Sequence, residues 1–268
     1  MTRKPSVAGT FYPGRADELR KMIHGFIDAK AAKTKALAVV SPHAGYIYSG
    51  PVAGAVFSSV EVPAVAVILG PAHREIRPVV AIEREGAWQT PLGEAAIATE
   101  LADLILERSS LVENDPAAHR LEHSLEVQVP FLQYLRPEVS LVPLCFSYDA
   151  AFEDLEEVGR AVAGAVRASG REALLVASTD MSHYVRQATA EKLDRLAIDR
   201  ILKLDAPGLV QTVAAQNITM CGVRPTAAAL VAARELGATR AELVRYATSG
   251  ERTGDYAEVV GYAGLRVV

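Results

Sequence analysis

The stretch that decides the fold is Ala64-Val65-Ala66-Val67-Ile68-Leu69, which runs directly into Gly70-Pro71-Ala72-His73. A continuous apolar run that is rich in β-branched residues is typical of a strand buried on both faces of a sheet. Glycine and proline then interrupt the run, as they commonly do at the end of a strand. The pattern therefore predicts a buried strand with a histidine-bearing loop at its carboxyl end.

The same alternation of apolar runs and helical patterns extends along the chain. Strands alternating with helices indicate an α/β fold, with a mixed, mostly parallel sheet flanked by helices on both faces. We expect the last two strands to be antiparallel neighbours. The further strands are expected at 36–40, 79–82, 139–146, 173–177, 243–247 and 259–267, and the helices at 16–30, 52–60, 95–107, 124–135, 151–169, 188–204, 206–214 and 224–236.

Length, composition and net charge exclude several classes of protein. With 268 residues, half of them hydrophobic, the chain can build one large core, and we expect a single domain over 1–268. A net charge of -4 argues against a nucleic-acid-binding protein. The two cysteines argue against a disulfide-linked secreted fold, and we find neither a signal peptide nor a membrane span. We therefore expect a soluble, cytoplasmic protein with no nucleic-acid or membrane partner.

Three histidines follow predicted strands. His43 and His73 come just after the first two buried strands, and His183 follows a later one, with Asp180 three residues before it. A single histidine in such a loop is usually solvated or simply hydrogen-bonded. Ligands in open α/β sheets bind beyond the carboxyl ends of the strands, however, so three histidines in equivalent positions favour a shared site.

Cys221 lies in Thr-Met-Cys-Gly-Val-Arg-Pro, at the start of a predicted helix. A thiolate is favoured at a helix N-terminus, although a lone cysteine is more commonly a small buried core residue. The neighbouring Gly222 and Arg224 favour a site, because an apolar core position rarely has both beside it. Cys145, within Val-Pro-Leu-Cys-Phe, has the pattern of a core residue.

His119 and His123 are four residues apart, which would place both on one face of a helix and allow metal binding. The turn-like Asn114-Asp115 and the following Pro116 argue against a continuous helix there. We therefore expect His123 to line the site and His119 to be structural or exposed. His24 lies within an amphipathic pattern and is expected at the surface.

Several of these motifs resemble those of the Memo family. In bacteria and archaea such proteins are similar to protein B of the AmmeMemoRadiSam system, which groups Memo, AMMECR-type and radical SAM proteins. The resemblance extends from the start of the chain to the last helix. The matching stretches are 6–13 (Ser-Val-Ala-Gly-Thr-Phe-Tyr-Pro), 42–46 with Ser49-Gly50, 70–73, 122–126, 178–183 and Cys221-Gly222 followed by Pro225.

The resemblance implies a fold similar to class III extradiol dioxygenases, non-haem iron enzymes that bind Fe(II) through two histidines and a carboxylate. It places His43 and His73 at the two histidine positions and Cys221 where those enzymes carry a glutamate. A thiolate is a softer ligand, which shifts the expected metal toward copper, zinc or thiolate-bound iron. We expect Fe(II) or copper first and zinc as the alternative.

Asp180, His183 and His123 would then line the same pocket as catalytic groups, with His183 as the acid–base group. The first functional hypothesis is that the chain is a metal-dependent, dioxygenase-like redox protein that acts on an unidentified small substrate.

The second hypothesis is a non-catalytic adaptor that docks a peptide or partner protein in the pocket. Metal-free hydrolysis by Asp180 and His183 ranks last, because no nucleophile or oxyanion hole is visible. The resemblance also implies a modification pathway, with radical SAM and AMMECR-type proteins as partners.

Overall fold

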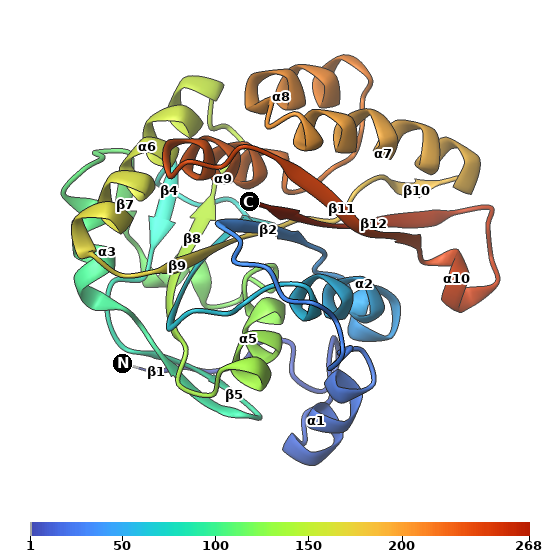
Figure 1. The fold of residues 1–268 in the computed structure, drawn as a ribbon, viewed down its shortest axis with the longest axis horizontal. Helices are drawn as coiled ribbons and strands as arrows, with labels where there is room; N and C mark the ends of the chain where they lie inside the picture. Colours follow the sequence, from blue (N-terminus) through green and yellow to red (C-terminus); the bar gives the residue numbers. More distant parts are fainter. Residues whose placement is uncertain (1) are drawn as a thin grey trace.

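A nine-stranded mixed sheet forms the centre of the molecule in the computed structural model, which describes residues 2–268 (Figure 1). Eight strands form a continuous path, and β11 (Ala241–Thr248) pairs with β12 off this path. The order along the path is β10 (His183–Val185), β12 (Val259–Val267), β2 (Ala38–Ser41), β9 (Ala173–Ser178), β3 (Val65–Pro71), β8 (Ser140–Phe146), β4 (Val80–Ile82) and β7 (Val112–Asn114). A second, small sheet contains β1 (Thr2–Arg3), β5 (Ala87–Thr90) and β6 (Gly93–Ala96).

The middle of the large sheet is parallel and its flanks are antiparallel. β2, β9, β3 and β8 pair in parallel, whereas β12 and β4 run antiparallel to their inner neighbours. β11 and β12 are antiparallel neighbours, as the sequence predicted. The predicted α/β class with a mixed sheet is confirmed, and the parallel middle brings the carboxyl ends of β2, β9 and β3 to one edge.

Alternate residues of the buried strands enter two separate cores. Val65, Val67 and Leu69 of β3 pack into one hydrophobic cluster, and Ala66 and Ile68 pack into the other. This alternation follows from the two-residue period of a strand. Helices cover both faces (Figure 1). The first cluster includes α3 (Thr99–Leu106), α6 (Phe152–Ser169), α7 (Gln187–Leu202), α8 (Ala206–Ala215) and α9 (Val223–Glu235), and the second includes α1 (Ala16–His24), α2 (Tyr46–Ser58) and α5 (Val129–Leu135).

Several predicted helix limits were wrong. The helix expected over 16–30 ends at His24. The helix expected over 95–107 begins only at Thr99, because its first two expected residues, 95 and 96, end β6. The helix expected from 124 begins at Val129, after a short 3-10 helix (Glu126–Gln128), because Pro130 fits only the first turn of an α-helix. No helix among residues 2–268 is long and apolar enough to cross a membrane.

The α2 helix begins earlier than its apolar pattern suggested. It was expected over 52–60 but runs from Tyr46 to Ser58, so it starts three residues after His43. Most of its residues are buried, so its sequence lacks the polar stripe that would have marked its N-terminal turns. The helix thereby ties the loop that contains His43 to the core.

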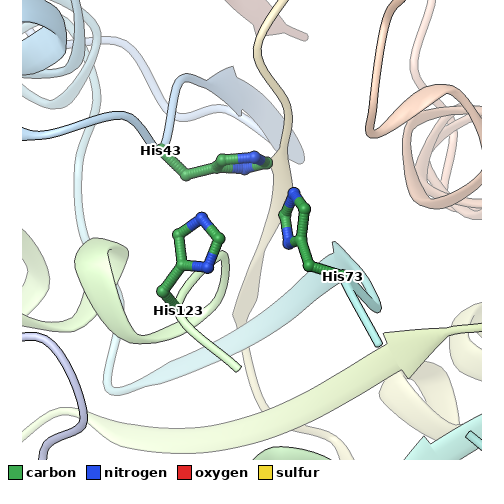
Figure 2. A group of neighbouring side chains, drawn as sticks. All are labelled: His43, His73 and His123. Carbon is green, nitrogen blue, oxygen red and sulfur yellow. The ribbon is translucent and has the colours of Figure 1, made fainter. Parts of the chain in front are cut away.

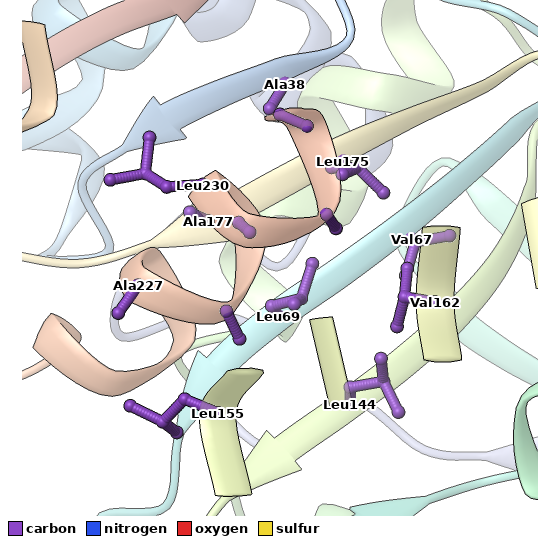
Figure 3. Packing of buried hydrophobic residues seen from close by; sticks show 14 of the residues in the cluster. Ala38, Val67, Leu69, Leu144, Leu155, Val162, Leu175, Ala177, Ala227 and Leu230 are labelled. Atoms are coloured by element: carbon purple, nitrogen blue, oxygen red, sulfur yellow. The ribbon is translucent and has the colours of Figure 1, made fainter. Parts of the chain in front are cut away.

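Close packing of α6 against α9 holds one helical layer on the sheet (Figure 3). Leu155 and Val162 of α6 and Leu230 of α9 belong to the same buried cluster as Val67 and Leu69 of β3. A Cβ atom at Gly159 of α6 would lie 2.7 Å from the carbonyl oxygen of Ala228 and 2.8 Å from Val231 Cβ. Glycine is required there by close approach of the two helices.

We expect Gly159→Ala to destabilise the protein by about 1–3 kcal/mol, because the backbone of α9 must move away. Gly164→Ala, in the same helix, is the matched control, since its nearest neighbour is the Arg108 side chain at 3.5 Å. That control should stabilise the helix by about 0.5–1 kcal/mol. Urea unfolding of both variants measures the difference, and an equal effect of the two substitutions would contradict the role of close packing.

Candidate metal centre

Three imidazole rings converge at the carboxyl edge of the parallel strands (Figure 2). His43 lies two residues after β2, His73 lies two residues after β3, and His123 lies in the loop between α4 (Pro116–His119) and the 3-10 helix. One nitrogen from each ring lies within 4.8 Å of the other two. Within residues 2–268, this is the one group of three histidine, cysteine, aspartate or glutamate residues with that spacing.

The His43 ring is fixed by Ser178 at the end of β9. The Ser178 hydroxyl donates to the carbonyl oxygen of Ser124 at 2.6 Å and accepts from Gln128 Nε2 at 2.8 Å. Its hydrogen is therefore already used, so the contact from His43 Nδ1 at 3.0 Å must be an N–H donated to Ser178 Oγ. This assigns the proton to Nδ1 and leaves the lone pair on His43 Nε2.

His73 is fixed in the same tautomer by Glu122. Its backbone N–H donates to Glu122 Oε2 at 2.7 Å, and its Nδ1 donates to Glu122 Oε1 at 2.9 Å. The backbone N–H of Ser124 donates to the same carboxylate. Burial alone would raise the pKa of Glu122, but the hydrogen bonds donated by His73 and the Ser124 amide hold this pKa well below its ordinary value. A carboxylate behind a histidine is a common support for a metal ligand.

His123 packs between other rings and has a weaker polar support. Its ring centroid is 4.3 Å from that of His73 and 4.8 Å from that of Phe11, and its Nδ1 lies 3.5 Å from Glu122 Oε1. Burial lowers the pKa of both His43 and His123, against the opposing charge of Glu122. The two imidazoles are thus held neutral, which is the form that binds a metal.

Cys221 lies beside this histidine group, next to one member of it. Its Sγ is 3.2 Å from His43 Nε2, and the backbone N–H of Asp180 donates to Sγ at 3.3 Å. Gly222 allows this approach, since a Cβ there would lie 2.4 Å from the carbonyl oxygen of Ser178. Burial and the Asp180 carboxylate raise the pKa of the thiol to about 12, so a metal must displace its proton in order to bind sulfur.

Asp180 supports the His43 loop from behind. Its Oδ1 accepts from the backbone N–H of His43 at 2.8 Å, and its Oδ2 lies 3.9 Å from His43 Nε2. Burial raises the pKa of this carboxyl to about 6, against the opposing effect of hydrogen bonds from the His43 and Ala44 backbone.

His183 lies outside the histidine group and is partly exposed. Its backbone N–H donates to Thr219 Oγ1 at 2.7 Å, and its Nδ1 donates to the carbonyl oxygen of Thr219 at 2.9 Å. Nε2 therefore carries the lone pair and is available as a base.

The structure thus brings His43 and His73 together as the sequence suggested, and it adds to them His123, which was expected to line the site as a catalytic group rather than as a ligand. Cys221 touches His43, while the supporting roles of Glu122, Ser178 and Gln128 were missed. The stretch Glu122-His123-Ser124 carried a signal for Glu122, because it places a carboxylate beside a candidate ligand. His119 is fully buried, whereas His24 is exposed and Cys145 is a core residue, as expected.

Comparison with known proteins gives a consistent family assignment. A family model described as "Memo-like protein" matches residues 3–266. A MEMO1 family protein of Methanothermobacter thermautotrophicus is 42% identical over 99% of this chain and 100% of its own length. Another, from Methanopyrus kandleri, is 43% identical over 99% of this chain and 98% of its own length. The crystal structure of an uncharacterized protein from Escherichia coli K12 has a similar fold, with a TM-score of 0.54 and 15% identity over 84% of this chain and 98% of that one.

The hydrogen bonds predict that His43 and His73 both carry their proton on Nδ1 in the metal-free protein. Two-bond proton–nitrogen correlation spectra of ¹⁵N-labelled protein distinguish this tautomer from the one protonated on Nε2. In Ser178→Ala we expect His43 to lose the fixed Nδ1–H form while His73 keeps it. A His43 ring protonated on Nε2 in the unsubstituted protein would contradict the assignment.

Proposed function

The chain belongs to the Memo family, and we propose that it acts there as a metal-dependent redox protein on a small substrate. In this proposal His43 and His73 are the fixed ligands, and His123 and Cys221 complete the coordination. The observation that carries it is the matched support of two rings by Ser178 and Glu122. Each support leaves an Nε2 lone pair for a metal.

The donor set fits a transition metal. Nitrogens bound to one tetrahedral metal lie about 3.3 Å apart, given metal–nitrogen bonds of about 2.0–2.1 Å. The three imidazole nitrogens lie within 4.8 Å of one another, so small side-chain rotations suffice to close the group. Imidazole suits zinc, copper and iron, and a thiolate adds a preference for soft metals. We propose Fe(II) or copper as the working metal, with zinc as the alternative.

The residues around the histidines would handle protons and orientation. Asp180, with its pKa raised to about 6 by burial, is placed to hold a proton next to His43. His183 has a free Nε2 and is partly exposed, which suits an acid–base group. When bound, a redox-active metal supplies a centre for substrate and dioxygen. Four protein ligands still leave positions open on a six-coordinate metal.

A docking function is the second candidate, favoured by an exposed aromatic residue beside the site. Tyr184 directly follows His183, is 73% exposed and has a φ of 55°. A bulky residue in the left-handed region is uncommon and is found preferentially at functional positions. In this alternative the pocket docks a peptide of a partner protein, with radical SAM and AMMECR-type proteins as the partners to test.

Metal binding is tested by metal analysis of protein purified without added metal, and by titration of metal-free protein with Co²⁺. We expect about one metal per chain, a loss of at least tenfold in affinity in His43→Ala and His73→Ala, and a smaller loss in His123→Ala. Cys221→Ser should retain binding but lose the sulfur-to-metal charge-transfer absorption.

His24→Ala is the matched control, because His24 is an exposed histidine at the end of α1. Equal metal content in His24→Ala, His43→Ala and His73→Ala would rule out this site. Binding of a partner peptide that persists in metal-free protein but fails in Tyr184→Ala would favour the docking function instead.

A further inference from the structure

The N-terminal stretch has no place in the proposed chemistry, yet it contacts the histidine loops. Residues 3–12, called the N-terminal clamp below, reach both the loop of His43 and the loop of His123. The contacts are largely buried and polar, and they join positions more than a hundred residues apart. Three of these contacts have a direct bearing on the metal centre.

The first is the saturated carboxylate of Glu126, three residues after His123. Oε2 accepts from Arg3 Nη1 and from both the backbone N–H and the hydroxyl of Ser6, each at 2.8 Å. Oε1 accepts from the backbone N–H of Val7 at 3.1 Å and from the Tyr12 hydroxyl at 2.7 Å. Five donors on one buried carboxylate fix the end of the His123 loop to the clamp.

The second contact is Arg3, which holds the other part of the same loop. Its Nε donates to the carbonyl oxygen of His119 at 2.7 Å, and its Nη2 donates to the carbonyl oxygen of Glu122 at 2.7 Å. The guanidinium also lies 4.2 Å from the ring centroid of Trp88. Arg3 therefore fixes the backbone of Glu122, the residue whose carboxylate orients His73.

The third contact is Phe11, which lies between two ligand loops. Its ring centroid is 4.8 Å from that of His123. Its carbonyl oxygen accepts from the backbone N–H of Tyr46 at 2.8 Å, at the start of α2 and three residues after His43. One clamp residue thus contacts the His123 ring and the helix that anchors the His43 loop.

We propose that the N-terminal clamp sets the distance between the histidine ligands, with Glu126 and Tyr12 as its main positioning residues. This inference rests on the proposed metal function. The loop of residues 119–126 has no strand partner of its own, so its shape depends on side-chain bonds, those of the clamp together with the bonds of Ser124 to Pro71 and Ser178. The contrary possibility is that the clamp contributes only to overall stability, as any buried ion pair would.

A pair of matched tyrosine substitutions separates the two possibilities. Tyr12→Phe removes a 2.7 Å hydrogen bond to buried Glu126, and Tyr246→Phe removes a 2.7 Å hydrogen bond to buried Asp194. The second bond contacts none of the three histidines. In the full-length protein, we expect Tyr12→Phe to weaken Co²⁺ binding about tenfold. Tyr246→Phe should change Co²⁺ affinity by less than about twofold. Both substitutions should shift the urea midpoint of unfolding by a similar amount.

Two further substitutions keep the test decisive if one variant folds poorly. Phe11→Leu removes the ring beside His123 and retains the backbone contact to Tyr46, so it should weaken Co²⁺ binding without a large loss of stability. Glu126→Gln removes the charge opposite Arg3 and should weaken binding more than Tyr12→Phe. If Co²⁺ affinity followed stability equally in Tyr12→Phe and Tyr246→Phe, the positioning role would be overturned.

Hydrogen exchange of the metal-free protein provides a readout that does not depend on metal. We expect faster amide exchange at residues 119–128 in Tyr12→Phe than in Tyr246→Phe. If the unsubstituted protein bound no metal but this difference appeared, the proposed function would fail and the clamp would stand as an ordering device for the loop. Unchanged exchange in Tyr12→Phe, with normal Co²⁺ binding in the unsubstituted protein, would overturn the clamp alone.

Discussion

Parallel pairing of β2, β9 and β3 is the constraint on which the site depends. Parallel strands end at the same edge of a sheet, so the residues that follow them meet without any further guidance. His43, Asp180 and His73 occupy these positions. The strands themselves are buried on both faces, and this burial fixes their register. The register in turn fixes where each strand ends relative to its neighbours, and so where each loop begins. The packing of the apolar strands thus determines the positions of His43, Asp180 and His73.

The Ser178 hydroxyl connects this sheet edge to the His123 loop, the one of the three histidine loops that does not follow a strand. It accepts from His43 and Gln128 and donates to the backbone of Ser124, next to His123. All of its hydrogen-bonding capacity is used, so neither the tautomer of His43 nor the approach of the 122–128 segment can vary freely. A buried polar network of this kind suits a preorganised ligand site, because each group is held before any metal binds.

The sequence predicted the parts of the site that depend on local pattern. His43 and His73 follow apolar runs, so their position at the ends of strands could be read directly. The support of His73 by Glu122 joins residues 49 apart, and that of His43 by Ser178 joins residues 135 apart. No periodicity encodes such pairs, since they depend on how loops fold over the finished sheet. The early start of α2 was missed for a related reason, because burial on most sides removes the amphipathic signal.

The three histidine loops differ in the contacts that hold them, and this difference has a consequence for the metal centre. The loops of His43 and His73 directly follow buried strands of the core, which fixes the point at which each loop leaves the sheet. The loop of His123 is held by Arg3, Tyr12 and the other donors to Glu126, which belong to the first residues of the chain. In the proposed clamp, breaking those bonds loosens one ligand and the carboxylate behind a second. The proposed clamp therefore acts on the metal centre through the His123 loop.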